Sequence, residues 1–219
     1  MMLFRNVVNS GAAMLIVLSC ATAHDYSTKE SIEGERQTVR EALVASALSV
    51  IGVDELVVDG KRFRMDCTGV VQGIYYGAGI DLYTPLRSYQ GDGVVRLYSF
   101  MDDNGLLADE SNPKPGDLVF WDNTYDKSRS GKVDDPLTHV GMIVSVSDNG
   151  DIQYIHHNYA RGIVLEHMNL NEPSLYSRVE DGETVIVNSF MRARSAPDYD
   201  KRLAGELVNS LGQAYYLAE

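Results

Sequence analysis

The Pro-Lys-Pro-Gly segment at residues 113–116 divides the chain into two parts with different apolar patterns. Before it, apolar residues recur every three or four positions, which is typical of amphipathic helices. After it, short apolar runs predict strands at 117–121, 139–146, 152–157, 163–168 and 184–190. The Asp-Asn-Gly-Asp segment at 148–151 predicts a tight turn between the second and third strands. Helices followed by an antiparallel meander indicate an α+β domain.

The helical spacing predicts one helix within residues 37–51, a second beginning at Cys67 and a third around residues 94–101. Asp59-Gly60 predicts a turn between the first two helices, within either a small hairpin or an extended lead-in. We expect these N-terminal helices to pack on an antiparallel sheet of five or six strands within residues 36–195. Residues 196–219 are predicted to form a C-terminal amphipathic helix, from about 199 to 216.

The first 23 residues are predicted to be an export signal. Arg5 supplies its positive end, and the apolar stretch at 11–18 is too short to span a bilayer. Cleavage after the Ala-Thr-Ala segment at 21–23 would release a soluble protein, whereas residues 17–20 resemble a bacterial lipobox in which Cys20 is lipidated. We prefer the lipoprotein, so a lipid on Cys20 would be the contact with the membrane. A polar tether is predicted at 24–35, and the protein would lie in the cell envelope or be secreted.

The charge of the chain limits its partners. Its formal net charge is −12, and we find no basic patch in the sequence to offset this. Such a surface repels phosphate backbones, so nucleic acid is not expected as a partner. The sequence does not predict an oligomeric state.

Cys67 is the only cysteine left once the export segment is discounted, so the mature chain cannot form an internal disulfide. Val70, Val71 and Ile74 follow Cys67 at the spacing of one helix face, and Asp66 is a suitable N-cap. The positive end of the helix dipole favours a thiolate in the first turn. We therefore expect Cys67 to be a nucleophile.

A cysteine nucleophile needs a base and a group that orients the base. His139 begins one predicted strand and His156 ends the next, so a hairpin between them brings both to one edge of the sheet. His157 must then point to the opposite face. His139, His156 and an acid could also bind zinc, but the chain has no H-E-x-x-H motif and zinc would leave Cys67 without a role.

Four segments carry a resemblance to a known family, at residues 66–71, 115–121, 139–143 and 154–156. In this order they resemble the NlpC-type branch of the papain-like cysteine peptidases, which are bacterial cell-wall hydrolases related to the CHAP amidases. The resemblance implies a papain-like fold, with Cys67 as nucleophile, His139 as general base and His156 as the orienting residue. Asp66 and Thr68 would support the nucleophile and the oxyanion. No cofactor is required, and the substrate would be an amide bond in a cell-wall peptide.

One departure from the family pattern keeps an alternative open. The family usually carries a tyrosine about a dozen residues before the nucleophile, but this chain has none between Tyr26 and Tyr75. A non-catalytic envelope protein that binds wall peptides or a partner is therefore the competing hypothesis. An amidase or acyltransferase that uses the same three residues is a further alternative.

The loop at 126–135 has the spacing of a calcium-binding loop. Asp126, Ser128, Ser130 and Asp134 provide oxygen atoms at alternating positions, and glycine occupies the sixth position. Two of the four are serines, and Leu137 stands where such loops carry a bidentate acid. We expect either a structural calcium ion here or a solvated polar loop.

Overall fold

The computed structural model describes residues 16–218, with side chains from residue 31 onward. The chain divides into two compact units, Met1–Thr38 and Val39–Glu219. Helix α1 (Ile16–Ser49) begins in the first unit and ends in the second, so the predicted tether at 24–35 is helical. Part of the predicted export signal, residues 1–15, lies outside the described residues. Within the described part, no helix combines the length and the apolar character needed to cross a membrane.

The second unit is built on a six-stranded antiparallel sheet in the order β3-β10-β4-β5-β6-β7. The predicted strands at 117–121, 139–146, 152–157 and 163–168 correspond to its central meander. The six strands of the sheet are β3 (Leu107–Ala108), β4 (Leu118–Trp121), β5 (His139–Val146), β6 (Asp151–Asn158), β7 (Gly162–Asn169) and β10 (Val208–Gly212). Together with the helices, this sheet confirms the predicted α+β, papain-like fold.

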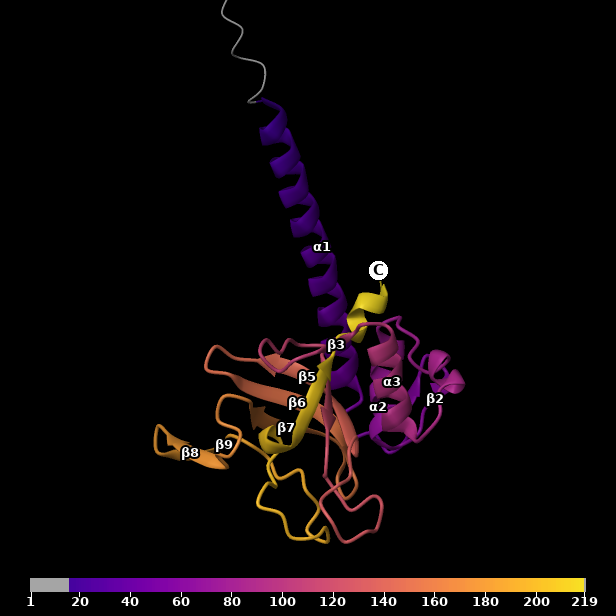
Figure 1. Cartoon of the computed structure of the whole chain (residues 1–219), viewed down its shortest axis with the longest axis vertical. Helices are drawn as coiled ribbons and strands as arrows, with labels where there is room; N and C mark the ends of the chain where they lie inside the picture. The colour runs from indigo at the N-terminus through magenta and orange to yellow at the C-terminus, as the bar shows by residue number, and fades with distance from the viewer. Residues whose placement is uncertain (1–15, 219) are drawn as a thin grey trace, which may run out of the picture. The chain divides into compact units, whose positions relative to one another are not determined.

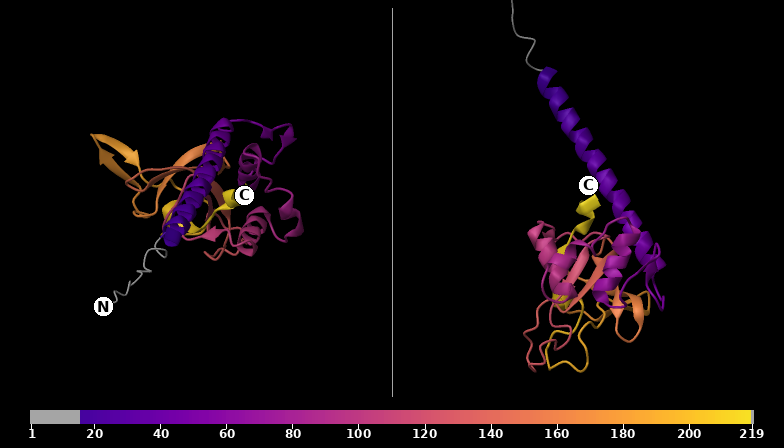
Figure 2. Two further views of the ribbon diagram at one scale, coloured as in Figure 1. Left: turned by 90° about the horizontal axis from the view of Figure 1, so that it is seen from above. Right: turned by 90° about the vertical axis from the view of Figure 1, so that its right-hand side faces the viewer.

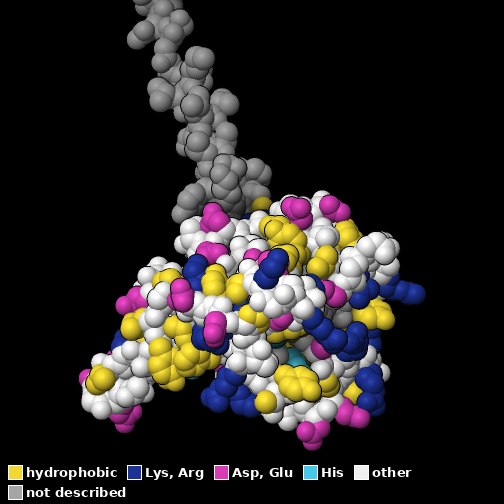
Figure 3. All heavy atoms as spheres, turned by 60° about the horizontal axis from the view of Figure 1, so that its bottom comes forward, with side chains coloured by type: hydrophobic (Ala, Val, Ile, Leu, Met, Phe, Trp, Pro, Cys, Tyr) yellow, Lys and Arg dark blue, Asp and Glu magenta, His cyan; other side chains and the backbone are white. Residues whose placement is uncertain are grey.

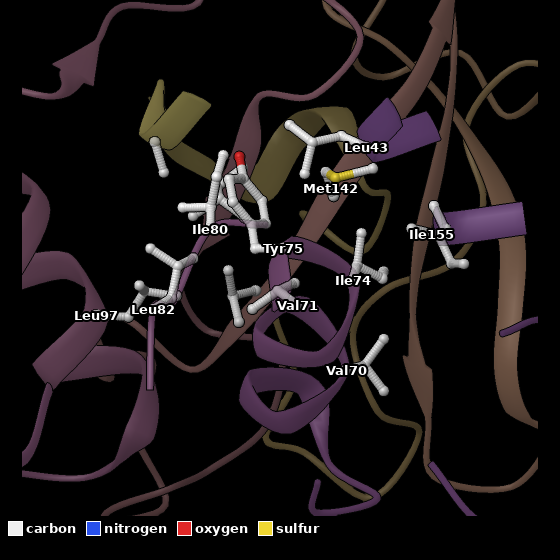
Figure 4. Packing of buried hydrophobic residues seen from close by; sticks show 14 of the residues in the cluster. Leu43, Val70, Val71, Ile74, Tyr75, Ile80, Leu82, Leu97, Met142 and Ile155 are labelled. Carbon is white, nitrogen blue, oxygen red and sulfur yellow. The ribbon is translucent and has the colours of Figure 1, made fainter. Parts of the chain in front are cut away.

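Helices α2 (Cys67–Gly77) and α3 (Gly93–Asp103) lie together on one side of the sheet (Figures 1 and 2). The one-turn helix η1 (Pro85–Ser88) lies between them in sequence. Tyr75 and Ile74 of α2 and Met142 of β5 are fully buried in the core between helices and sheet (Figure 4). Leu43 and Ala47, on the last turns of α1, are buried in the same core, as their helical spacing predicts.

A second apolar cluster covers the opposite face of the sheet. Trp121, Tyr154, Met168 and Leu211 are fully buried in it. The side chains of the central strands therefore pack on both faces, because alternate residues point to opposite sides.

Two hairpins lie outside the main sheet. The predicted Asp59-Gly60 turn joins β1 (Val57–Val58) to β2 (Lys61–Arg62), with positive φ at both turn residues. The run at 184–190, which we predicted as a strand of the meander, instead places β9 (Glu183–Ile186) opposite β8 (Ser177–Glu180) in a separate two-stranded sheet (Figure 1).

The predicted C-terminal helix at 199–216 is wrong. This segment forms η2 (Gly205–Leu207), strand β10 and η3 (Ala214–Ala218). Leu203, Leu207 and Leu211 have helical spacing, but in the fold β10 is inserted between β3 and β4. Tertiary pairing therefore overrides the local pattern, because β10 supplies backbone partners to two strands at once.

We expect Leu211→Ala to lower the free energy of unfolding by about 2–5 kcal/mol. The Leu211 side chain is fully buried, so its removal leaves a cavity beside β10. The matched control is Leu217→Ala at a 38% exposed position, where the loss should be below about 0.5 kcal/mol. Urea denaturation measures both values. Equal losses in the two variants would contradict the central position of β10.

Candidate active site

Cys67 occupies the first position of α2, as predicted. The Asp66 side chain caps this helix by accepting a hydrogen bond of 2.8 Å from the Gly69 backbone N–H, and it also forms an ion pair of 2.8 Å with Arg64. A Cβ atom at Gly69 would lie 2.1 Å from the Arg64 carbonyl oxygen. Glycine at this position therefore lets the chain before the nucleophile fold closely over the first turn of the helix.

The structure brings His139 and His156 together across the β5–β6 pairing. His139 Nε2 lies 2.8 Å from His156 Nδ1, and the two rings are nearly perpendicular. Gly141 permits this approach, since a Cβ there would lie 2.7 Å from the Ile155 carbonyl oxygen and 3.2 Å from His156 Cβ. The predicted contact between the two histidines thus depends on a close pairing of β5 with β6.

Trp121 and Thr138 hold the start of β5 in place. The indole of Trp121 packs on the His139 ring at a centroid distance of 5.9 Å and donates a hydrogen bond to the Ala204 carbonyl. The buried Thr138 hydroxyl bonds to the Trp121 carbonyl and accepts the Thr124 backbone N–H. The His139 ring therefore projects from a rigid part of the sheet.

Glu166 on β7 is a site residue that our sequence analysis missed. It is buried and its Oε2 lies 3.2 Å from His156 Nε2, although outside hydrogen-bond geometry. The same carboxylate accepts a hydrogen bond of 3.1 Å from the Tyr154 hydroxyl and pairs with Arg161. In the β6–β7 register Glu166 is opposite Tyr154, on the sheet face that carries His156.

Two hollows meet at Cys67. The first, here the histidine hollow, has a volume of about 850 Å³ and is lined by Cys67, His139, His156 and His157, with Tyr159, Phe190 and Met191 farther out. The second, here the cationic hollow, has a volume of about 550 Å³ and is lined by Cys67, Arg64, Arg87, Arg96 and Lys127. In Figure 3, Lys and Arg side chains lie on either side of a hollow in which a histidine is visible. Asp66, Tyr125 and Thr138 line both hollows, so the half-buried thiol lies where a bound chain could cross from one to the other.

The thiol and its expected base are both neutral in this environment. Burial, and then the nearby Asp66 carboxylate, raise the pKa of Cys67, although bonds from Thr68 and the Val140 backbone act in the opposite direction. Burial, followed by the neighbouring His156 and His157, holds the pKa of His139 well below its ordinary range. Burial and the Arg161 charge lower the pKa of His156 to about 3. The thiol pKa is therefore raised, not lowered as we expected from the helix start, and burial is the largest cause.

The remaining predicted residues are placed as follows. Thr68 is buried and its hydroxyl lies 4.0 Å from Cys67 Sγ. His157 lines the histidine hollow, on the sheet face opposite to His156. Tyr125 was not singled out from the sequence, yet it lines both hollows.

The four residues of the predicted calcium loop come close together. Asp126 accepts backbone hydrogen bonds from Ser130 and Gly131, and the Ser130 hydroxyl donates to Asp134. The Ser128 hydroxyl lies 3.5 Å from Asp126 Oδ1. Among residues 16–218, no group of three His, Cys, Asp or Glu side chains has the arrangement of a metal site. Calcium binding by this loop stays a prediction.

We expect the rate at which iodoacetamide alkylates Cys67 to be low at neutral pH, since only the thiolate reacts. The rate should keep rising with pH beyond the ordinary thiol pKa of 9.0. Peptide mapping by mass spectrometry would follow Cys67 separately from Cys20. A rate that levels off below neutral pH would instead indicate a preformed ion pair of thiolate and imidazolium.

Comparison with protein families gave a match to part of the chain. Residues 58–158 match the model of the CHAP domain family, and they include Cys67, His139 and His156. Comparisons with curated proteins and with solved structures gave no match. CHAP domains are generally hydrolases of the amidase or peptidase type that act on cell-wall peptidoglycan. A CHAP domain is thus found at residues 58–158, which is consistent with the resemblance to the CHAP-related, papain-like family.

Proposed function

We propose that this protein is an exported thiol hydrolase that cleaves an amide bond in bacterial cell-wall peptides. Cys67 is the nucleophile, His139 is the general base and His156 orients it. One observation carries the proposal: Cys67 and His139 line the same hollow, and His139 is bonded to His156 at 2.8 Å. Covalent catalysis needs a nucleophile, a base and a group that orients the base, and this observation supports that assignment.

The contacts support one assignment of protons. If His139 Nδ1 takes the thiol proton, Nε2 must carry the other ring proton and donate it to His156 Nδ1. His156 then carries its own proton on Nε2, which faces the Glu166 carboxylate at 3.2 Å. The charge that develops on His139 during reaction is thus stabilised through His156 by a buried anion.

The reaction proceeds in two halves. His139 removes the thiol proton as Sγ attacks the amide carbonyl, and it returns that proton to the leaving nitrogen when the carbon–nitrogen bond breaks. Water then gives a proton to His139 and attacks the thioester, which releases the acid and restores the thiol. The backbone N–H of Thr68, in the first turn of α2, supports the oxyanion.

Export and location are part of the proposal. The apolar segment and the Cys20 lipobox-like motif support delivery to the cell envelope, with lipid on Cys20 as the membrane anchor. Calcium at Asp126, Ser128, Ser130 and Asp134 would stiffen the loop that leads into His139; it would take no part in the bond cleavage.

We expect Cys67→Ala to abolish the release of fragments from purified cell-wall material, because it removes the only nucleophile of the proposed reaction. Mass spectrometry of the fragments would also tell peptide cleavage from sugar–peptide amide cleavage. Cys67→Ala must keep the unfolding temperature of the wild type. Identical fragments from both proteins would eliminate the hydrolase, and no fragments from either would favour the non-catalytic alternative, which the missing upstream tyrosine supports.

Glu166→Gln is expected to lower kcat about tenfold, or ~1.4 kcal/mol, since an amide stabilises the imidazolium less than a carboxylate does. Removal of the anion also makes His139 harder to protonate, so the acid limb of the pH–rate profile should move to lower pH. The control is Glu172→Gln, which makes the same change at an acid paired with Arg178. An unshifted acid limb would limit Glu166 to a structural role.

A further inference from the structure

The second half of the proposed reaction needs a water molecule at a defined place. His139 gives a proton to the leaving nitrogen in the first half and takes one from water in the second, so both groups occupy the same place beside its ring. His139 lines the histidine hollow but not the cationic hollow, whereas Cys67 lines both. The hydrolytic water must therefore attack the thioester from the histidine hollow.

His157 lies on the side of the sheet that carries the nucleophile. Met142 is opposite Ile155 in the β5–β6 pairing, and the same register two residues further sets His157 opposite Val140. Val140 and Ile155 belong to the core on which α2 packs, and the Val140 N–H bonds to the sulfur of Cys67. The His157 side chain therefore projects from the face that α2 covers, at the end of the sheet where Cys67 begins this helix.

His157 also differs from the other polar side chains of the histidine hollow in having free ring nitrogens. Beside the bonded pair of His139 and His156, six polar residues of this hollow have partners within the protein: Asp66, Thr124, Thr138, Asn158, Arg161 and Arg192. Tyr125, Tyr159 and Arg194 are exposed. Among the side chains of residues 31–218, the structure records no hydrogen bond or ion pair for the half-buried His157 ring. Its nitrogens are thus open to a molecule bound in the hollow.

The charge state of His157 suits a bound water molecule. Burial lowers the pKa of His157 below the usual value for a histidine; the Asp66 carboxylate acts in the opposite direction, and His156 adds to the decrease. The ring is therefore neutral at neutral pH, with one nitrogen that donates a hydrogen bond and one that accepts. A neutral imidazole can accept a hydrogen bond from water, whereas a protonated one cannot.

We propose that His157 is a further catalytic residue, which holds the hydrolytic water beside the thioester on Cys67. One hydrogen of the water points to His139 Nδ1, which takes it as a proton, and the other is bonded to the open nitrogen of His157. The hydroxyl oxygen attacks the thioester carbon, the carbon–sulfur bond then breaks, and the proton on His139 passes to the Cys67 sulfur. His157 neither gains nor loses a proton, so its effect is confined to the second half of the reaction. This role rests on the proposed hydrolase function.

The test separates the two halves of the reaction with p-nitrophenyl acetate, a small ester that acetylates thiols. In full-length protein, the burst of p-nitrophenolate measures acetylation of Cys67, and the steady rate that follows measures hydrolysis of the thioester. We expect His157→Phe to keep the burst rate and to lower the steady rate about tenfold, the size of one hydrogen bond. Acetylated Cys67 should then accumulate, which peptide mapping by mass spectrometry detects.

Two further measurements distinguish a bound water from a structural role. His157→Gln should recover most of the steady rate, because the amide oxygen can accept the same hydrogen bond. Hydroxylamine in excess does not depend on a held water, so it should release the acetyl group from the wild type and from His157→Phe at equal rates. The control is His167→Phe, the same change at a half-buried histidine of β7 outside both hollows, which should keep the burst and steady rates.

The outcomes also separate this role from the hydrolase itself. Equal losses of burst and steady rate in His157→Phe, an unchanged steady rate, or no recovery by His157→Gln or by hydroxylamine would overturn the role of His157. The same holds if His167→Phe slows the steady rate as much as His157→Phe does. In each of these cases, turnover by the wild type still supports the hydrolase. A wild type that is acetylated on Cys67 no faster than an unfolded thiol would instead count against the hydrolase, and this role would be lost with it.

Discussion

The close pairing of β5 with β6 is the constraint on which the site depends. Gly141 lets the two strands and Trp121 approach, and the register then sets His139 beside His156 at 2.8 Å. A side chain at Gly141 would push on the Ile155 carbonyl and on His156 itself. The helices fix the other partner, because α2 packs on the same sheet through Ile74 and Tyr75 and carries Cys67 at its start. Packing in the core thus sets the positions of Cys67, His139 and His156.

The same burial that fixes these groups keeps them uncharged. Desolvation raises the pKa of Cys67 and lowers those of His139 and His156, so the resting pair is a thiol and an imidazole. In the proposed reaction, proton transfer must then accompany attack on the substrate. The buried Glu166, held by Tyr154 and Arg161, lies 3.2 Å from His156 Nε2. Opposite charges on Cys67 and His139 would therefore exist only during the proposed reaction, when the substrate covers the cleft.

Much of this could be predicted from the sequence where local pattern and fold agree. The Asp66 cap, the spacing after Cys67 and the Asn149-Gly150 turn are local signals, and with strand alternation they suffice to place three of the site residues. The segment around β10 was predicted as a helix because Leu203, Leu207 and Leu211 also fit helical spacing, and the insertion of β10 between distant strands has no local signal. Glu166 was not singled out from the sequence, because its role depends on Arg161 and His156, which the sequence does not show to be its neighbours.

The place of β10 also affects how the domain folds. β4 lies between β5 and β10, so the sheet cannot be completed until residues 208–212 have been synthesised. Contacts between residues so far apart in sequence carry a high loop-closure cost and slow the search for the native topology. Until then the edge of β4 stays open to pairing with other chains. A chaperone that shields this edge would therefore raise the yield of folded protein more than one that protects the helices.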